Sequence, residues 1–347
     1  MPVATWTPVP DPAPNGTPPV RPHRLIVVAT VLLASVWPTA WALRQGDLSA
    51  LVAPGITGPS LELLAREVPG LVVAHNAGHD GQQFYAIARK PFGPRQTARY
   101  LTTPSYRYRR ILFPLLGWAM APHGGRRLIV ALAAIGLVSV ALSAASLRAL
   151  PGARWWLPLV VAATPGVVAS LMLGLSDTLA LAFTLLAFAA AAHRRWALLV
   201  VALVLAALSK ETAFLAAPAL ALTPGMPARA RLAAVAAPAF VLIGWIAWIN
   251  HALNASLSTA SQFARPLSGW IHSTDGAGGL AVGLLLAVTI AVGARRAGGA
   301  PHVRAYLIVL LALMTVLAPD ITESWLNTSR SVIAGVPLAA WAITAHA

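Results

Sequence analysis

Residues 128–148 read LIVALAAIGLVSVALSAASLR, and the only charged side chain in this run is Arg148 at its end. A helix that crosses a bilayer needs about 20 consecutive, mostly apolar residues. Comparable apolar runs recur along the chain from Leu25 to the C-terminus. Because lipid offers no hydrogen-bond partner to the backbone, such runs cross a membrane as helices. The sequence therefore predicts an all-α polytopic membrane protein.

The overall composition agrees with this reading. Of the 347 residues, 58% are hydrophobic and 10% are charged, whereas soluble domains carry about 25% charged residues. The formal charge of +15 would suggest a nucleic-acid partner in a soluble protein. Here many Lys and Arg lie in short loops between apolar runs, where they set topology. Those in the long first loop could instead hold an anionic substrate. We therefore expect the lipid bilayer, and no nucleic acid, as a partner.

The apolar runs predict about ten membrane helices. They cover residues 25–43, 128–148, 155–173, 177–192, 196–209, 211–223, 232–251, 278–294, 303–319 and 330–345. The pair 196–209 and 211–223 is either one long helix or two helices that meet at Lys210-Glu211. Residues 1–24 are rich in proline and are predicted to be a disordered cytoplasmic tail. Residues 25–347 are predicted to form a single transmembrane domain.

Positive charge in the short loops predicts the orientation of the chain. With a cytoplasmic N-terminus, and provided that 111–122 does not cross, one set of basic residues falls inside: Arg21, Arg24, Arg148, Arg154, Arg194, Arg195, Arg229, Arg231, Arg295, Arg296 and Arg304. Nearly all acidic residues then fall outside: Asp47, Glu62, Glu67, Asp80, Asp177, Glu211, Asp275, Asp320 and Glu323. The acids played no part in choosing the orientation, so their segregation supports it.

Two long polar segments would lie outside the membrane. Residues 44–127 form the first extracytoplasmic loop, and 252–277 form a second. Loops longer than about 15 residues are usually functional or disordered. The first one mixes aromatic residues with many arginines, so we expect helices lying on the membrane surface near 59–68 and 80–89.

The stretch from His75 to Ala88 holds the first candidate site residue. Asp80 precedes residues that have the spacing of an apolar helix face, so it could simply be a helix cap. Alternatively, it acts at the membrane surface as a base or a metal ligand. His75 and His79 are four residues apart, as in a helical zinc pair, but Gly78 between them argues against a regular helix there.

Cationic residues provide the other candidates. Arg107, Arg109 and Arg110 lie among tyrosines, where they could anchor the chain at the interface or bind a phosphate bidentately. Lys210 beside Glu211 interrupts an apolar stretch, and such charges are functional candidates by default. Alternatively, Lys210 and Glu211 could neutralise each other as an ion pair between two short helices. Asp177 opens a helix, and Arg330 begins the last one; each could act at a site or serve only as a helix-end charge.

The order of these motifs resembles the GT-C fold glycosyltransferases. The segment Asp80-Gly81 with Phe84-Tyr85, followed by Tyr106-Arg107 and then by Arg109-Arg110-Ile111-Leu112-Phe113-Pro114-Leu115-Leu116, is similar to the first extracytoplasmic loop of bacterial relatives of the PIG-V type mannosyltransferases. Ser176-Asp177-Thr178 and Leu208-Ser209-Lys210-Glu211 resemble the acidic second outer loop and the basic residue closing a later helix. The likeness covers about 75–215, and the rest matches by hydropathy alone.

This resemblance implies a function. It implies transfer of a sugar, such as mannose, from a polyprenyl-phosphate donor to a glycan, lipid or protein acceptor outside the cytoplasm, in the inner membrane of a bacterium, as part of cell-envelope assembly. Asp80 would be the general base and Asp177 the second acid. The residues that would bind substrate are Gln83, Tyr85, Arg107, Arg109, Arg110, Lys210 and Arg330. The carboxylates of Asp80 and Asp177 could also hold a divalent Mg or Mn ion.

Two other functions remain compatible with the sequence. A transporter or flippase for a lipid-linked precursor would share the outer arginines, although it would also need charges along a path through the membrane. A non-catalytic component of the envelope machinery would not need Asp80, Asp177 and Lys210 to converge. Whether these residues line one cavity is therefore the decisive structural question.

Overall fold

The computed structural model describes residues 22–255, 265–271, 276–322 and 325–345. Most of the proline-rich N-terminal segment, part of 252–277, and two of the predicted outer acids, Asp275 and Glu323, lie outside the described residues. Within the described residues the fold is helical, and no strand is formed beyond two isolated bridges that join 54–55 to Ala74 and Gly78.

Long apolar helices form the body of the molecule. Four described segments are long and apolar enough to cross a membrane: Arg24–Gln45 in α1 (Pro22–Gln45), α7 (Gly125–Arg148), α13 (Ala228–Leu253), and Leu280–Gly299, which begins within α15 (Gly276–Arg296). Shorter apolar helices accompany them: α10 (Asp177–Ala192), α11 (Trp196–Ser209), α16 (Pro301–Thr315) and α19 (Gly335–Thr344). The structure thus agrees with a membrane-embedded all-α protein.

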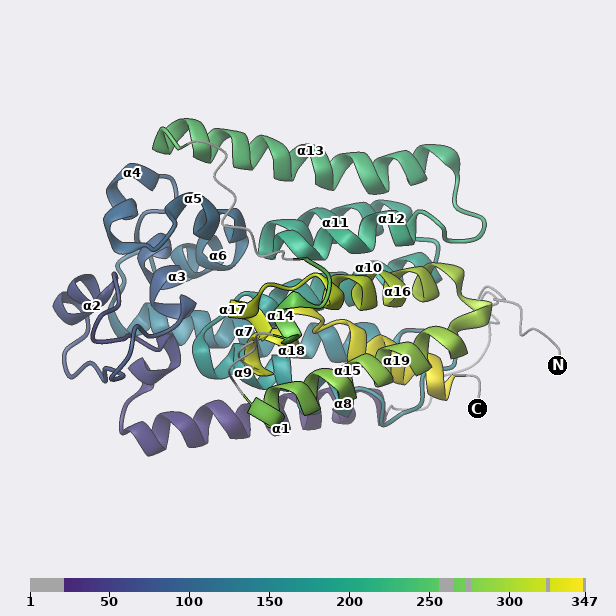
Figure 1. Ribbon diagram of the computed structural model, residues 1–347, viewed down its shortest axis with the longest axis horizontal. Helices are drawn as coiled ribbons and strands as arrows, with labels where there is room; N and C mark the ends of the chain where they lie inside the picture. The colour runs from purple at the N-terminus through teal and green to yellow at the C-terminus, as the bar shows by residue number, and fades with distance from the viewer. Residues whose placement is uncertain (1–21, 256–264, 272–275, 323–324, 346–347) are drawn as a thin grey trace.

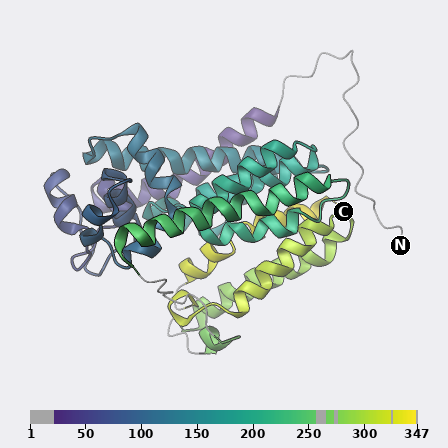
Figure 2. The ribbon, with the colours of Figure 1, turned by 90° about the horizontal axis from the view of Figure 1, so that it is seen from above.

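Short helices fill the connections. In the first long loop these are η1 (Leu48–Val52), α2 (Leu61–Glu67), α3 (Asp80–Arg89), α4 (Pro94–Thr97), η2 (Ala98–Tyr100), α5 (Pro104–Arg107), η3 (Tyr108–Arg110) and α6 (Leu112–Met120). Later ones are α8 (Leu159–Ala163), α9 (Pro165–Leu173), η4 (Glu211–Leu215), α12 (Ala216–Leu220), α14 (Ser268–Ile271), η5 (Ala297–Gly299), α17 (Pro319–Thr322) and α18 (Trp325–Ser331). Figure 1 shows the long helices running side by side with α2–α6 gathered at one end, and Figure 2 shows the same division from above.

The core is built around α10, which is buried along almost its whole length and packs on α7 and α11. Its alanines let neighbouring helices approach closely. The outward faces of the long helices are apolar instead: on α13, Phe240 is 80% exposed and Ile243 is 65% exposed. Apolar surface of this extent is typical of helices that face lipid.

Several predicted helices match the structure, and others are interrupted. The predicted bounds 177–192, 196–209 and 80–89 are confirmed residue for residue. The continuous helix predicted over 155–173 is wrong: it divides at Pro165 into α8 and α9, because proline lacks the amide hydrogen that a helix interior needs. The helix predicted over 330–345 is likewise divided: Arg330 and Ser331 end α18, a turn covers 332–334, and α19 runs from Gly335 to Thr344.

The chain also breaks at Lys210, whose backbone is extended (φ −159°, ψ 127°). Residues 196–223 therefore form two helical segments, α11 and then η4 with α12. Between 111 and 122 the structure has only the nine-residue α6. Such a helix is about 14 Å long and is too short to cross a bilayer.

Basic loops gather at the end of the bundle opposite α2–α6. His193 Nε2 lies 2.9 Å from the carbonyl oxygen of Ala149, so the loops after α7 and α10 are in contact. Trp341 Nε1 donates a hydrogen bond of 2.9 Å to the carbonyl oxygen of Pro151, which brings the end of α19 to the same place. These loops carry several of the arginines expected to be cytoplasmic, including Arg148 and Arg194.

Candidate active site at the loop-bearing end of the bundle

Asp80 is fixed by the way that α3 meets the bundle. The backbone amide of His79 donates a 3.0 Å hydrogen bond to the carbonyl oxygen of Ala53. At the next position after Asp80, a Cβ on Gly81 would lie 2.1 Å from the carbonyl oxygen of Leu173 at the end of α9. Only glycine allows this approach, so Gly81 sets the first turn of α3, and with it Asp80, directly against the bundle.

Three arginines surround the Asp80 carboxylate. Its Oδ2 atom lies 2.6 Å from Arg107 Nη1, 3.6 Å from Arg110 Nη1 and 3.9 Å from Arg330 Nη2. Arg107 and Arg110 come from the first loop, whereas Arg330 comes from α18 near the end of the chain. The shortest contact in each of these three ion pairs is made to Oδ2.

The second carboxylate, Asp177, is fully buried at the start of α10. Lys210 Nζ donates to its Oδ1 at 2.6 Å, and Arg330 Nε donates to its Oδ2 at 2.8 Å. Lys210 also donates to the carbonyl oxygen of Arg330 at 2.9 Å. Arg330 therefore contacts both carboxylates and joins the two halves of the predicted site.

A third carboxylate completes the charged cluster. Glu211 accepts two hydrogen bonds from Arg110, each 3.1 Å long, which connect η3 to η4. The Tyr106 hydroxyl also contacts the Arg110 guanidinium, and the Arg110 Cζ atom lies 4.9 Å from the centre of the Tyr106 ring. Such bidentate pairing gives geometric specificity as well as energy, so Arg110 is held in one orientation.

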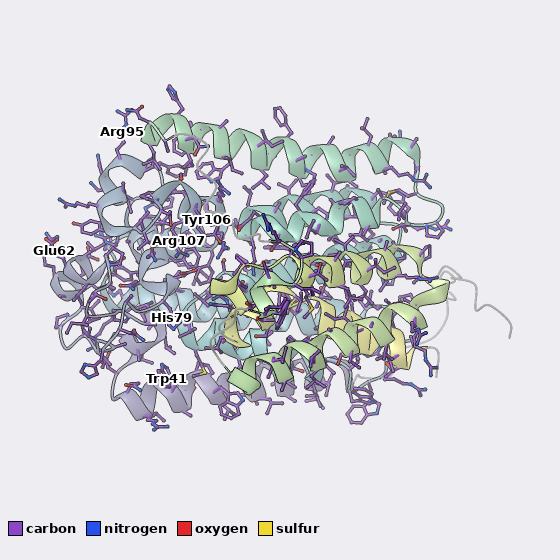
Figure 3. All side chains as sticks on the ribbon, in the orientation of Figure 1. Trp41, Glu62, His79, Arg95, Tyr106 and Arg107 are labelled. Carbon is purple, nitrogen blue, oxygen red and sulfur yellow. The ribbon has the colours of Figure 1, made fainter. Side chains whose placement is uncertain are left out.

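Most of these side chains line one cavity with a volume of about 420 Å³, but Asp177 and Glu211 do not. Its wall includes Gln83, Asp80, Arg107, Arg110, Lys210 and Arg330 from the predicted set, together with His79, Thr102, Tyr106 and Asn327. Figure 3 shows His79, Tyr106 and Arg107 at the end of the bundle that bears the loop helices. Gln83 is oriented by Thr102, whose backbone amide and hydroxyl donate to Gln83 Oε1 at 2.8 and 3.0 Å.

The cluster carries a net positive charge. Four cations, Arg107, Arg110, Lys210 and Arg330, face three carboxylates, Asp80, Asp177 and Glu211. The surplus is one positive charge. A water-accessible cavity with one uncompensated cation is suited to a monoanion, such as a phosphodiester.

The cations determine the ionisation of Asp80. Burial raises the pKa of its carboxyl, but the guanidiniums of Arg107, Arg330 and Arg110 outweigh that effect and hold the pKa below its ordinary value of 3.8. Burial and the charge of Arg330 lower the pKa of His79, despite the opposing effect of Asp80. At neutral pH, Asp80 is therefore ionised and His79 is a neutral imidazole.

Three predicted site residues do not line the cavity: Asp177, Tyr85 and Arg109. Tyr85 is fully buried, its hydroxyl donates to Glu67 Oε2 at 2.6 Å, and it accepts a 2.7 Å bond from the Gly125 amide. Arg109 lies over the ring of Tyr106, with its Cζ atom 5.7 Å from the ring centre, and it does not line the cavity. Conversely, the structure adds Glu211, Tyr106, His79 and Asn327, which the sequence-based set of site residues did not include.

The carboxylates do not offer a good site for a divalent metal. Asp80 Oδ2 and both oxygens of Asp177 already face cationic side chains, which repel a metal ion. Among the described residues, no group of three or more His, Asp or Glu side chains could hold a metal ion. The residues present therefore fit an anionic ligand better than Mg or Mn.

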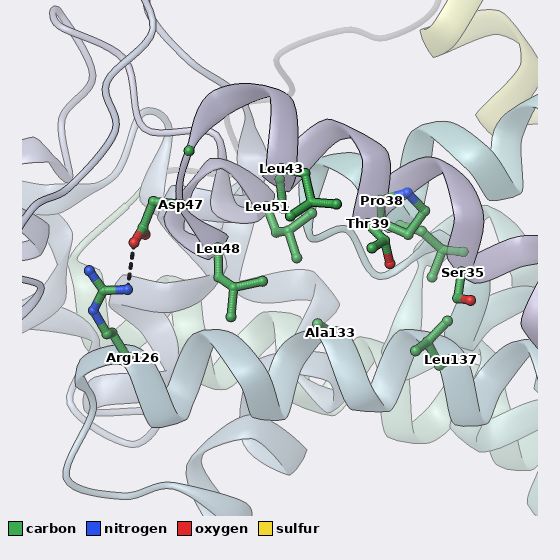
Figure 4. Close-up of a pocket in the computed structure, with 13 residues that line it drawn as sticks. Ser35, Pro38, Thr39, Leu43, Asp47, Leu48, Leu51, Arg126, Ala133 and Leu137 are labelled. Carbon is green, nitrogen blue, oxygen red and sulfur yellow. Dashed lines mark hydrogen bonds and ion pairs between the residues drawn. The ribbon is translucent and has the colours of Figure 1, made fainter.

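Two apolar hollows lie near this site. One, about 370 Å³ in volume, is lined by residues such as Trp41, Val168 and Met172, and shares His79 with the charged cavity. The other, about 470 Å³, lies between α1 and α7 and shares no lining residue with the charged cavity. Figure 4 shows its apolar wall and the 2.5 Å ion pair between Asp47 and Arg126 at one end.

Comparison with known proteins adds no family. No family model, no curated protein and no solved structure matches this chain.

Proposed function

We propose that this chain is an integral-membrane glycosyltransferase that moves a sugar from a polyprenyl-phosphate donor to an extracytoplasmic acceptor. The observation that carries the proposal is that Asp80, Lys210 and three arginines line one cavity, while the buried Asp177 is bound to Lys210 and Arg330. These residues are separated by up to 250 positions in sequence, so their meeting is a property of the fold and not of local sequence.

The cluster supports a phosphodiester donor. A sugar linked through one phosphate carries one negative charge there, which matches the surplus of one positive charge in the cavity. Arg107 and Arg330 would hold the phosphate and stabilise it as the leaving group. The apolar hollow next to His79 supports an isoprenoid chain beside the phosphate, since apolar pockets take apolar parts of ligands.

Asp80 is the proposed general base. The acceptor hydroxyl oxygen attacks the anomeric carbon, the bond between that carbon and the phosphate oxygen breaks, and the hydroxyl proton passes to Asp80. The configuration at the anomeric carbon is inverted. Oδ1 is the proposed proton acceptor, because each arginine makes its shortest contact with Oδ2. Tyr85 and Arg109 would support the loop without touching substrate.

The donor itself would make Asp80 more basic. An ionised carboxylate paired with Arg107 at 2.6 Å is a weak base. A phosphate that binds Arg107 competes with this ion pair, so the pKa of Asp80 rises when the donor is bound. Proton removal would then be favoured only in the complex with the donor.

The proposed orientation puts the charged cavity outside and the basic loops in the cytoplasm, with about ten membrane segments and both termini inside. The cluster supports an enzyme over a transporter, since Asp177 starts α10 and Lys210 follows α11, so these charges lie at helix ends. A non-catalytic role is less well supported, because it gives no reason for the convergence.

The test is sugar transfer by the purified chain in liposomes. Radiolabelled mannose, glucose or galactose on polyprenyl phosphate is supplied with membrane extract as the acceptor source, in the presence of EDTA. We expect label to move from the donor to an acceptor, and the Asp80→Asn variant to lose at least about a hundredfold in rate. Asp47→Asn, which changes a carboxylate outside the cavity, is the matched control.

A negative result has a clear form. If the folded wild-type chain transfers none of these sugars, or if Asp80→Asn transfers as fast as the Asp47→Asn control, the proposed enzymatic role of the cavity is wrong. Loss of transfer in EDTA, restored by Mg or Mn, would overturn the assignment of phosphate stabilisation to the arginines.

A further inference from the structure

A second charged hollow lies within the first loop, apart from the site described above. It has a volume of about 460 Å³ and is lined by parts of α2, α3, α4 and η2. Its lining includes Arg89, Lys90, Arg95 and Arg99, and one carboxylate, Glu67. It shares no lining residue with the cavity around Asp80.

Among the residues that the structure describes, three of these cations have no acidic partner. Glu67 is occupied by Arg89, at 2.8 Å, and by the Tyr85 hydroxyl. Within the part of the chain that the structure describes, Lys90, Arg95 and Arg99 form no ion pair; each is exposed and contacts a neutral oxygen. These oxygens are Gln96 Oε1 at 2.8 Å from Lys90, the Ala252 carbonyl at 2.5 Å from Arg95 and the Tyr100 hydroxyl at 2.6 Å from Arg99. The hollow therefore attracts an anion.

Its position relative to the membrane follows from α13. Arg95 donates to the carbonyl oxygen of Ala252, in the last turn of this candidate membrane span, and Figure 3 shows Arg95 beside that end of the helix. The end of a spanning helix lies at the level of the lipid headgroups. Arg95 is consequently held at headgroup level.

Exposed aromatic residues lie next to the same cations. Phe92, two positions after Lys90, is 59% exposed, and Trp118 in α6 is 37% exposed. Their rings meet edge to face with 6.1 Å between centroids. Exposed aromatic residues beside Lys and Arg are typical of the boundary between membrane and water. A purely aqueous anion site would have no need of this apolar pair.

We propose that the hollow bounded by Lys90, Arg95 and Arg99 binds the phosphate headgroup of an anionic phospholipid, with Phe92 and Trp118 inserted beside it at the membrane surface. Each cation near an anionic lipid surface strengthens the attraction by about fivefold. Bound lipid would hold the first loop against the bilayer. This inference is independent of the transfer reaction, because the hollow shares no residue with the proposed active site.

The test uses the absence of cysteine from the chain. Gln96→Cys, at an exposed position in the hollow, gives a single site for a fluorescent label on the full chain in nanodiscs. Two nanodisc preparations contain phosphatidylcholine and a minor fraction of a lipid that is brominated near the top of its acyl chain. This brominated lipid is phosphatidylglycerol in one preparation and phosphatidylcholine in the other, and it quenches the label when it lies close to it. We expect at least about twofold stronger quenching by the anionic lipid.

Three sets of variants provide the test and its controls. Replacing Lys90, Arg95 and Arg99 by Gln should abolish the preference, whereas Lys90→Arg with Arg95→Lys and Arg99→Lys should keep it. Arg195→Gln with Arg229→Gln and Arg231→Gln removes the same charge from other exposed arginines and should leave the preference unchanged.

Three outcomes would overturn the proposal. They are equal quenching by the two lipids, a preference that survives loss of the three cations, and an equally large response of the label in lipid-free detergent to glycerol phosphate in solution. The last outcome would assign the hollow to a soluble phosphate compound instead of a phospholipid.

Discussion

Arg330 Nε donates a 2.8 Å hydrogen bond to Asp177 Oδ2, and the two residues are 153 positions apart in the sequence. The same guanidinium reaches Asp80 Oδ2 with Nη2 at 3.9 Å. One side chain from near the end of the chain therefore connects the carboxylate at the start of α10 with the carboxylate at the start of α3. Stability and the proposed chemistry consequently depend on the same cluster.

Asp177→Ala is expected to destabilise the fold strongly. Lys210 would be left buried without its carboxylate and Arg330 would keep only the 3.9 Å contact with Asp80, and breaking such a buried pair costs about 3–5 kcal/mol. A thermal melt in detergent measures the loss. Asp47→Ala is the control, because its partner Arg126 is half exposed and such pairs contribute about 0–1 kcal/mol. Equal melting temperatures for the two variants would show that the buried cluster is not important for stability.

Arg107→Gln is expected to change the pH dependence of transfer. Arg107 is the foremost of the charges that lower the pKa of Asp80 below 3.8, so its removal raises that pKa. The base must be ionised to act, so the rate falls on the acid side as pH drops through the pKa. We therefore expect the acid limb of the rate profile to move to higher pH in Arg107→Gln. An unmoved limb would mean that another group limits the rate.

The same ion pairs give Asp80 a pH-dependent effect on stability. A carboxyl whose pKa is lower in the folded than in the unfolded chain stabilises the fold above the unfolded value. That contribution is present above about pH 3.8 and is lost as pH falls through the lowered folded pKa. Arg107→Gln brings the folded pKa of Asp80 closer to its unfolded value, so Asp80 stabilises the variant less at neutral pH. The melting temperatures of the wild type and the variant should therefore converge as pH falls.

Tyr85→Phe separates structural from functional roles in the first loop. The variant removes one hydrogen bond to Glu67 and leaves the Gly125 amide without its acceptor. A loss of about 1–3 kcal/mol in stability is expected. Because the ring lies outside the charged cavity, the transfer rate per folded molecule should stay close to that of the wild type. A lower transfer rate without a loss of stability would indicate that Tyr85 contacts substrate after all.

Sequence alone predicted the parts of the fold that depend on local pattern. The helices 177–192 and 196–209 end where an apolar run meets a charged or helix-capping residue, and such boundaries can be predicted from the local sequence alone. Asp80 was predicted as a helix start because an apolar helix face follows it. Pro165 itself marks the division between α8 and α9, since proline lacks the amide hydrogen that a helix interior needs.

Pairing between distant residues could not be predicted in this way. Glu211 meets Arg110 across 101 positions, and nothing local to either residue specifies the other. The sequence offered Lys210 and Glu211 as partners of each other, whereas the structure pairs Lys210 with Asp177 and Glu211 with Arg110. Such choices depend on how η3 and η4 pack, which is a property of the assembled bundle.

Gly81→Ala tests whether the approach of α3 to α9 positions the proposed base. The added Cβ would lie 2.1 Å from the carbonyl oxygen of Leu173, a backbone atom that cannot move aside alone. Overpacking of this kind costs about 1–3 kcal/mol, and α3 must shift away from the bundle together with Asp80. Gly244→Ala is the matched control, because no atom lies within 4 Å of its added Cβ, and alanine favours a helix by up to about 1 kcal/mol. We expect Gly81→Ala to lower both the melting temperature and the transfer rate, and Gly244→Ala to lower neither. If Gly81→Ala behaves as Gly244→Ala does, the close contact between α3 and α9 does not hold Asp80 in place.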